Sequence, residues 1–276
     1  MGSPTILDTI LERRRVDVAA ARQAVPPAEL ERRLPGAPPE IDFLARLRRD
    51  APMAVIAEIK RASPSKGDIA PGLDAAEQAL RYARGGASAI SVLTEPTWFK
   101  GTLDDMAAVR AALEALGPDR PGVLRKDFII DEYQLLEARV HGADAVLLIV
   151  AALDDARLAA LMAGARALGM QALVEVNNAD EMERAAALGT DLIGINNRDL
   201  RSFRVDLATT ERLASLVPPG ALLAALSGIS TRADVERFAS VGATAVLVGE
   251  SLMLAPDPAE KVRELRGLPV STRSAP

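Results

Sequence analysis

The feature that most constrains the fold is an eightfold alternation of short apolar runs with segments of helical periodicity. The runs are rich in Val, Ile, Leu and Ala, and they occupy residues 54–60, 87–94, 122–128, 145–151, 171–176, 192–198, 222–228 and 245–251. Strands that alternate with helices form parallel sheets, and near-continuous apolar strands indicate a sheet that is covered on both faces. Eight such units predict an α/β fold, a closed (β/α)8 TIM barrel, with an open doubly wound sheet as the less favoured alternative.

The segment before the first apolar run predicts a helical N-terminal extension of the barrel, over residues 1–50. Apolar residues recur at helical spacing over 6–25 and again over 41–50, with a proline-rich break between the two helices. Such an extension could cap one mouth of the barrel or form a lid over the substrate site. We expect a single domain over residues 1–276, with a frayed tail near 267–276.

Composition excludes several classes of protein. The formal net charge is −5 and acidic and basic residues are mixed along the chain, so no basic patch predicts binding to nucleic acid or to a membrane. There is no cysteine, and no apolar run approaches the roughly 18 residues of a membrane span. The N-terminus lacks the apolar core of a secretory signal. We therefore expect a cytoplasmic protein with a small-molecule partner, as a monomer or a weak homo-oligomer.

Charged and polar side chains interrupt the apolar runs near their C-terminal ends, and these ends form the catalytic face of a barrel. Period-two alternation places Glu58 and Lys60 on one face of a strand. A single buried Lys–Glu pair is more often a structural ion pair than a catalytic one. Six convergent positions reverse that weighting and predict a catalytic site formed by Glu58, Lys60, Lys126, Glu175, Asn196 and Arg198.

Glycines near the ends of the last two runs predict a phosphate site. Gly228 follows Ser227, and Gly249 precedes Glu250. Backbone N–H groups after the seventh and eighth strands of a barrel commonly hold a phosphate group. The substrate is therefore expected to be a phosphate ester.

Three cations at the same mouth, those of Lys60, Lys126 and Arg198, exceed the need of a monophosphate. They indicate a second anionic group on the ligand or an acid catalyst. Lys126 is the better acid, because an ammonium group in a partly dry pocket can give its proton to a carbonyl or a departing hydroxyl. Glu58 and Glu175 are candidate bases. No metal-ligand motif and no dinucleotide-binding glycine motif is found, so we expect no metal and no cofactor.

Seven segments together carry a resemblance to a known family. They are AEIKRASPSKGDI, TEPTWFKG, VLRKDFIIDEYQ, LVEV, GINNRDL, SGIS and LVGESLM, in this order and spacing. The chain closely resembles indole-3-glycerol phosphate synthase of tryptophan biosynthesis over nearly its whole length, including the helical prefix. The resemblance implies a barrel that converts 1-(2-carboxyphenylamino)-1-deoxyribulose 5-phosphate to indole-3-glycerol phosphate, with release of carbon dioxide and water. It implies no cofactor.

The resemblance also implies a role for each residue of the predicted catalytic site. Lys60 meets the anionic substrate and can take part in acid chemistry, while Glu58 orients the neighbouring charges. Lys126 resembles the general acid that protonates the ribulose carbonyl as the anthranilate ring carbon attacks it. Glu175 resembles the glutamate that assists proton removal and dehydration. The substrate's hydroxyls and carboxylate would be positioned by Asn196 and Arg198.

Further positions are implied to bind the substrate without reacting. Ser63 and Pro64 shape the loop after the first strand. The apolar wall for the aromatic ring would consist of Phe99, Phe128 and Leu247, and the phosphate would be held by Ser227, Gly228, Gly249 and the backbone of Glu250.

The chain departs from the family pattern at two places. Where the family usually has Glu-Ser-Gly after the seventh strand, this chain has Leu226 before Ser227, which removes a carboxylate from the catalytic end. Asn177 and Asn178 after the fifth strand are a minor change. Impaired turnover is one consequence to expect. A degenerate barrel that only binds a phosphorylated ligand is an alternative, as is another phosphosugar barrel such as phosphoribosylanthranilate isomerase.

Overall fold

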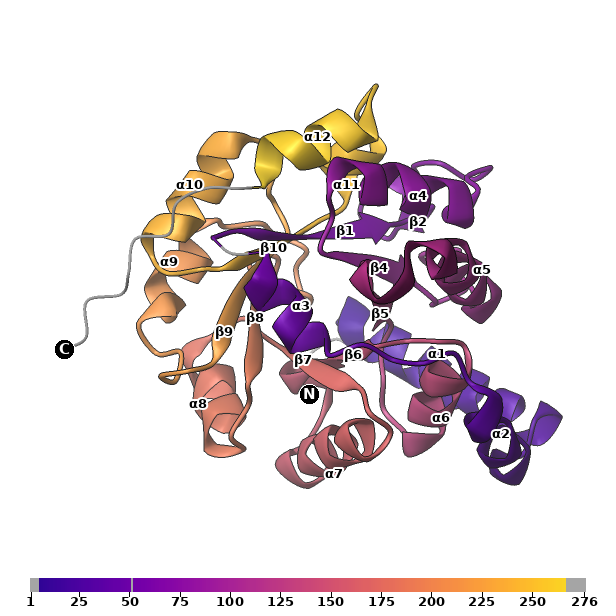
Figure 1. Cartoon of the computed structure of the whole chain (residues 1–276). Coiled ribbons are helices and arrows are strands. Elements are labelled where there is room, and N and C mark those ends of the chain that lie inside the picture. Colours follow the sequence, from indigo (N-terminus) through magenta and orange to yellow (C-terminus); the bar gives the residue numbers. More distant parts are fainter. Residues whose placement is uncertain (1–4, 51, 267–276) are drawn as a thin grey trace.

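The computed structural model describes residues 5–50 and 52–266, and its centre is a closed barrel of eight parallel strands. The order around the barrel is β1-β10-β9-β8-β7-β6-β5-β4, so strands that follow one another in the barrel series are neighbours and the last pairs with the first (Figure 1). The predicted (β/α)8 barrel is confirmed, and the open-sheet alternative is wrong. The barrel strands are β1 (Ala54–Ile59), β4 (Ala89–Leu93), β5 (Gly122–Lys126), β6 (Ala145–Ile149), β7 (Gln171–Val176), β8 (Leu192–Asn196), β9 (Leu222–Leu226) and β10 (Ala245–Val248).

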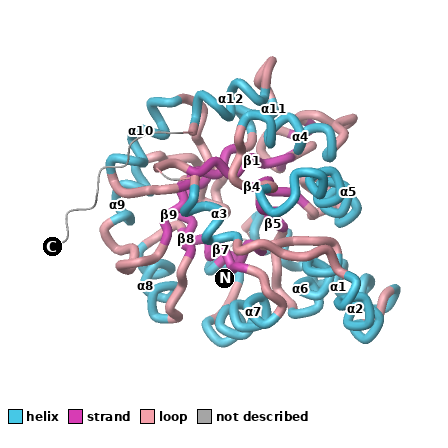
Figure 2. The backbone as a smooth tube through the Cα atoms, viewed as in Figure 1, coloured by secondary structure: helices cyan, strands magenta, loops and turns pink. Residues whose placement is uncertain are grey.

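Helices surround the barrel on its outside (Figure 2). A side chain caps the N-terminus of most of them; Thr102 and Asp105, for example, form a reciprocal capping box at the start of α5. The surrounding helices are α4 (Ala75–Gly85), α5 (Leu103–Leu113), α6 (Glu132–Val140), α7 (Asp155–Ala167), α8 (Ala179–Ala187), α9 (Ala208–Ala214), α10 (Arg232–Ser240) and α12 (Pro258–Leu265). Shorter elements are a hairpin after β1, made of β2 (Ala62–Ser63) and β3 (Gly67–Asp68), the four-residue α11 (Glu250–Met253), and the 3-10 turns η1 (Leu34–Gly36), η2 (Glu114–Asp119) and η3 (Val150–Ala152).

Alternation along each strand divides the apolar side chains between two cores. In β1, Val55, Ala57 and Ile59 pack against the surrounding helices. Ala54 and Ile56 instead belong to the core inside the barrel. Because successive residues of a strand point to opposite faces, Glu58 continues the inner row and lies at the C-terminal mouth. The same alternation gives each barrel strand one inward side chain close to this mouth.

The strands are shorter than several of the apolar runs that predicted them. Lys60 comes directly after β1, and Arg198 is the second residue after β8, so neither lies within its strand. Ser227 and Gly228 follow β9 with φ of 66° and 79°, which is the left-handed region and ends a strand. These residues therefore lie on the first turn of each loop.

The N-terminal helices lie at opposite mouths of the barrel. α3 (Phe43–Arg49) places Phe43 against Gly122 at the start of β5, where an added Cβ would come within 2.5 Å of the ring, so α3 closes the N-terminal mouth. α1 (Ile6–Ala24) instead packs Leu7 with Phe128 and Ile149 at the catalytic mouth. In Figure 1, α3 lies in front of the barrel and the fainter α1 behind it. The extension thus places one helix at each mouth of the barrel.

The proline-rich segment between these helices is not only a break. It contains α2 (Pro27–Arg33), which begins with Pro27 at its first position and packs against α6. Proline suits this position, because its fixed φ is helical and the first N–H of a helix needs no partner within the helix. The predicted frayed tail at 267–276 lies outside the described residues.

A buried ion pair ties α1 to the strand that carries Lys126. Arg14 Nη2 donates to Asp127 Oδ2 at 3.1 Å, and both side chains are buried. Asp127 also accepts hydrogen bonds from Arg125 and from Thr94. Burial alone would raise the pKa of Asp127, but the two guanidinium groups and these hydrogen bonds outweigh it, and the pKa is lowered.

Removal of Arg14 should therefore destabilise the fold. We expect Arg14→Met to lower the free energy of unfolding by about 3 kcal/mol, because it leaves a buried carboxylate with fewer partners. The control is Arg13→Met, which removes an exposed pair with Asp17 and should cost less than about 1 kcal/mol. Urea unfolding measures both, and equal losses for the two variants would contradict the account.

Candidate active site

The strand ends at the catalytic mouth surround one large cavity of about 620 Å³. This volume lies within the roughly 300–1,000 Å³ of ordinary ligand pockets. Every residue of the predicted site except Phe128 lines it: Glu58, Lys60, Ser63, Pro64, Phe99, Lys126, Glu175, Asn196, Arg198, Ser227, Gly228, Leu247, Gly249 and Glu250.

Glu58 and Lys60 form an ion pair at the end of β1. Lys60 Nζ lies 2.9 Å from Glu58 Oε1, and the glutamate is 5% exposed. Burial would raise the pKa of Glu58, but Lys60, Lys126 and Arg198 together outweigh it, so the pKa is lowered. Glu58 is therefore an ionised partner for cations rather than a strong base at neutral pH.

Glu175 has a different environment. Asn196 Nδ2 donates to its Oε1 at 2.8 Å, and Lys126 Nζ lies 3.9 Å from its Oε2, which has no hydrogen-bond partner. Burial raises the pKa of Glu175, and the attraction of Lys126 and the hydrogen bond from Asn196 offset this only in part. A carboxyl group with a raised pKa can both take and give a proton near neutrality, as proton-transfer catalysis requires.

The opposite side of the cavity contains the predicted phosphate turn. Gly249 is followed by the four-residue α11, in which the N–H groups of Glu250 and Ser251 have no partner within the helix, whereas those of Leu252 and Met253 bond to the Gly249 carbonyl. A Cβ added at Gly249 would lie 2.5 Å from Glu58 Oε1, so the glycine also leaves room for that carboxylate. Lys66 from the β2–β3 hairpin pairs with Glu250 at 3.2 Å, which joins this side of the cavity to the loop after β1.

The aromatic wall is arranged differently from the prediction. Phe99 lines the cavity, but Phe128 is 7% exposed and lies behind it, with ring centroids 6.2 Å apart and tilted by 42°. Phe128 packs in the same apolar cluster as Leu7 of α1. Its ring therefore contacts the N-terminal extension and does not line the cavity. A ligand would meet Phe99 first.

Leu226 points into the barrel as expected for the inner row of β9. It is 1% exposed, lines the cavity, and packs against Gly194 of β8, where an added Cβ would lie 2.7 Å from Leu226 Cδ1. The inward position at the end of β9 is therefore filled by a well-packed apolar side chain.

Several supporting residues were not predicted from the sequence. Buried Asn197 donates from Nδ2 to the carbonyls of Leu226 and Ser227, and so holds the turn after β9. Buried Glu95 accepts from the backbone N–H of Phe99 and fixes its loop. Glu95 directly follows one apolar run and Asn197 lies near the end of another, but neither position alone indicates a hydrogen-bond partner. Lys66 lies within a recognised motif, but was given no role.

No group of three or more His, Cys, Asp or Glu side chains that could hold a metal ion is found among residues 5–50 and 52–266. None of the helices in this part of the chain is both long enough and apolar enough to cross a membrane. His141 lies at the C-terminal end of α6, away from the cavity.

The fold and the cavity define a (β/α)8-barrel enzyme with its site at the C-terminal ends of the strands. The family model for indole-3-glycerol phosphate synthase matches residues 7–265. The chain belongs to the indole-3-glycerol phosphate synthase family, which confirms the resemblance that its motifs carry.

Individual relatives agree with this assignment. Indole-3-glycerol phosphate synthase from Roseiflexus sp. (strain RS-1) is 52% identical over 265 residues, which is 95% of this chain and 98% of that protein. The multifunctional tryptophan biosynthesis protein of Schizosaccharomyces pombe is 53% identical over 268 residues, 96% of this chain, but the chain spans only 35% of its length. The crystal structure of 3-hexulose-6-phosphate synthase from Salmonella typhimurium has a TM-score of 0.60 at 18% identity and covers 77% of this chain and 96% of that one, a likeness of fold.

The contact between Gly249 and Glu58 can be tested. We expect Gly249→Ala to displace the Glu58 carboxylate and to weaken binding of indole-3-glycerol phosphate by roughly 10-fold, or about 1.4 kcal/mol. Gly72→Ala is the control, because an added Cβ there meets nothing within 4 Å. Isothermal titration calorimetry measures both, and unchanged affinity in Gly249→Ala would show that the contact does not shape the site.

Proposed function

We propose that this chain catalyses the ring closure of 1-(2-carboxyphenylamino)-1-deoxyribulose 5-phosphate to indole-3-glycerol phosphate, with loss of carbon dioxide and water. The observation that carries the proposal is the pairing of Lys126 with Glu175 in a cavity that also offers a phosphate turn and an aromatic wall. Membership of the family supports the same activity.

Lys126 and Glu175 carry the proton transfers in this proposal. Lys126 protonates the ribulose carbonyl oxygen as the ring carbon that bears the carboxylate attacks the carbonyl carbon. Loss of carbon dioxide then restores the aromatic ring. Glu175 assists the dehydration, since its raised pKa lets it take a proton from the intermediate and pass one to the departing hydroxyl.

The other side chains of the cavity bind and orient the substrate. Lys60, held by Glu58, and Arg198 attract its anionic groups, and Asn196 orients Glu175 as well as the substrate's hydroxyls. Phe99 and Leu247 contact the aromatic ring. The backbone of the turns at Gly228 and Gly249 holds the phosphate group, next to Ser227 and Glu250.

Because Leu226 is uncharged, the site contains more cations than carboxylates. Among the described residues that line the cavity, four cations, those of Lys60, Lys66, Lys126 and Arg198, are present with three carboxylates, those of Glu58, Glu175 and Glu250. A site with surplus positive charge should bind a substrate with carboxylate and phosphate groups well, but its proton transfers are less finely balanced. We infer slow turnover. A barrel that binds the phosphorylated ligand without efficient turnover is the second candidate, and Leu226 is the observation in its favour.

The proposal extends to partners and location. The partner is a phosphorylated small molecule rather than nucleic acid or membrane, and the protein is a cytoplasmic monomer or weak homo-oligomer. Size-exclusion chromatography with light scattering tests the oligomeric state.

Lys126→Ala tests the proposed reaction directly. We expect turnover of the carboxyphenylamino ribulose phosphate, followed by indole absorbance, to fall by at least about 10²-fold, because general acid catalysis is worth about that much. Binding of the product should change little. Lys261→Ala on α12, which does not line the cavity, is the control. Near-normal turnover in Lys126→Ala would show that the acid is another group.

Leu226→Glu tests the effect of the missing carboxylate. We expect turnover to rise by roughly 10-fold or more, because a carboxylate at the mouth of β9 would restore the balance of charges. Leu226→Gln has a similar shape without the charge and should not show the increase. Equal steady-state rates in Leu226→Glu and the parent would contradict the proposal, and a lower rate would mean that the pocket is adapted to leucine.

A further inference from the structure

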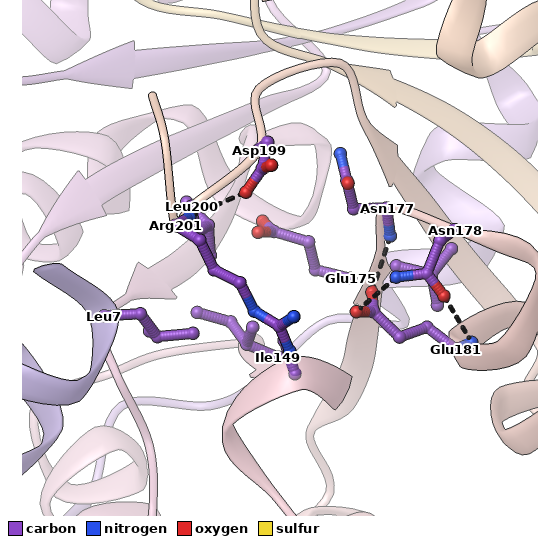
Figure 3. A pocket seen from close by; sticks show the side chains of 11 residues that line it. Leu7, Ile149, Glu175, Asn177, Asn178, Glu181, Asp199, Leu200 and Arg201 are labelled. Carbon is purple, nitrogen blue, oxygen red and sulfur yellow. Dashed lines mark hydrogen bonds between the residues drawn. The ribbon is translucent and has the colours of Figure 1, made fainter. Parts of the chain in front are cut away.

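A second, smaller cavity of about 80 Å³ adjoins Glu175 (Figure 3). Glu175 and Leu200 line both cavities. The remaining walls come from α1, the turn after β6, the start of α8 and the loop after β8: Leu7, Ile149, Ala151, Val176, Asn177, Asn178, Glu181, Asp199 and Arg201. Figure 3 shows the Glu175 carboxylate among these side chains. Glu175 thus separates a large substrate cavity from a small one.

The small cavity reaches the surface. Asn178 and Arg201 in its lining are exposed, whereas Glu175 is 2% exposed. Polar side chains form one wall of the cavity between Glu175 and these exposed residues. Glu181 lies between Asn177 and Asn178, accepting from the backbone N–H of Asn177 and from Asn178 Nδ2, both at 2.7 Å. The cavity therefore offers polar partners along its length.

One carboxylate oxygen of Glu175 has no hydrogen-bond partner, and water in this cavity could supply one. Its Oε2 is buried, has no hydrogen-bond partner, and is the oxygen that lies nearest to Lys126 Nζ. A buried carboxylate oxygen without a partner is costly unless water supplies one. A cavity of 80 Å³ has room for roughly two or more water molecules, and each needs two to four polar partners. The carboxylates of Glu175, Glu181 and Asp199 line the cavity and can serve as such partners.

The proposed reaction requires protons from solvent. Lys126 gives one proton to the carbonyl oxygen, and the hydroxyl that leaves as water takes a second. A base recovers one proton during dehydration. Because the substrate's carboxylate anion departs as neutral carbon dioxide, each turnover consumes one net proton. This proton must reach the Lys126–Glu175 pair again before the next turnover.

We propose that the small cavity is a water-filled proton inlet, through which one proton per turnover passes from bulk solvent to Glu175 Oε2 and on to Lys126 Nζ. This inference rests on the proposed function. The substrate fills the large cavity during the reaction, so a route behind Glu175 supplies protons without crossing it. The charged groups that face Glu175 are Lys126, Glu58 and Glu181, with Asp199 and Arg201 on the far wall of the inlet. Glu181 and Glu58 favour the protonated carboxyl group, as a proton carrier requires.

Ala151→Leu tests the inlet by filling it. Ala151 lines the small cavity but not the large one, so the substrate site keeps its lining. We expect product affinity and the rate of the first turnover to match the parent, while the steady-state rate falls about 10-fold and shows a larger solvent isotope effect in D2O. Ala152→Leu is the control: Ala152 borders a separate groove, and both of its rates should match the parent. Leu7→Phe fills the inlet from the opposite wall if Ala151→Leu does not fold.

Structure determination gives a readout that needs no turnover. In a crystal structure of the parent we expect ordered water within hydrogen-bond distance of Glu175 Oε2, and its loss in Ala151→Leu. A dry cavity in the parent would overturn the inlet. Equal steady-state rates in an active parent and in Ala151→Leu would overturn it as well and leave the proposed reaction standing. A parent that binds the substrate without turnover would instead refute the proposed reaction itself.

Discussion

The inner face of a closed parallel barrel is the constraint on which the rest of the structure depends. Every strand contributes alternate side chains to this one face, and all strands end at the same mouth. Apolar side chains fill the barrel below the mouth, and charged ones meet at the top. Burying these charges costs several kcal/mol each unless they are paired, and apolar residues would stabilise the fold at least as well. Stability does not explain their presence, so chemistry is the better explanation.

Pairing then divides the charges into two kinds. Glu58 makes a close ion pair with Lys60 and has a lowered pKa, which suits a fixed electrostatic partner. Glu175 lies farther from Lys126 and has a raised pKa, which suits proton transfer. Two carboxylates from similar strand ends thus acquire different properties from their surroundings. Leu226 occupies a third inward position at this mouth with an apolar side chain in place of a carboxylate.

Much of the fold followed from the sequence, because alternation and periodicity are local signals. In β1, the alternation of side chains places Glu58 at the end of the inward-facing row and apolar residues in the outward-facing row. Local signals of this kind could not predict which distant segments contact one another. Arg14 meets Asp127 across 113 residues, and Phe128 lies behind Phe99 because α1 packs against it. α2 forms within a proline-rich segment because Pro27 occupies a position at which proline is tolerated.

The most direct test of the central claim, that the mouth of the barrel is the ring-closing site, is a crystal structure of the chain with bound indole-3-glycerol phosphate. The account predicts the phosphate group on the turns at Gly228 and Gly249. It predicts the indole ring against Phe99, with Lys126 and Glu175 next to the newly formed ring. A phosphate group bound elsewhere, or an indole ring out of reach of Lys126 and Glu175, would contradict the account.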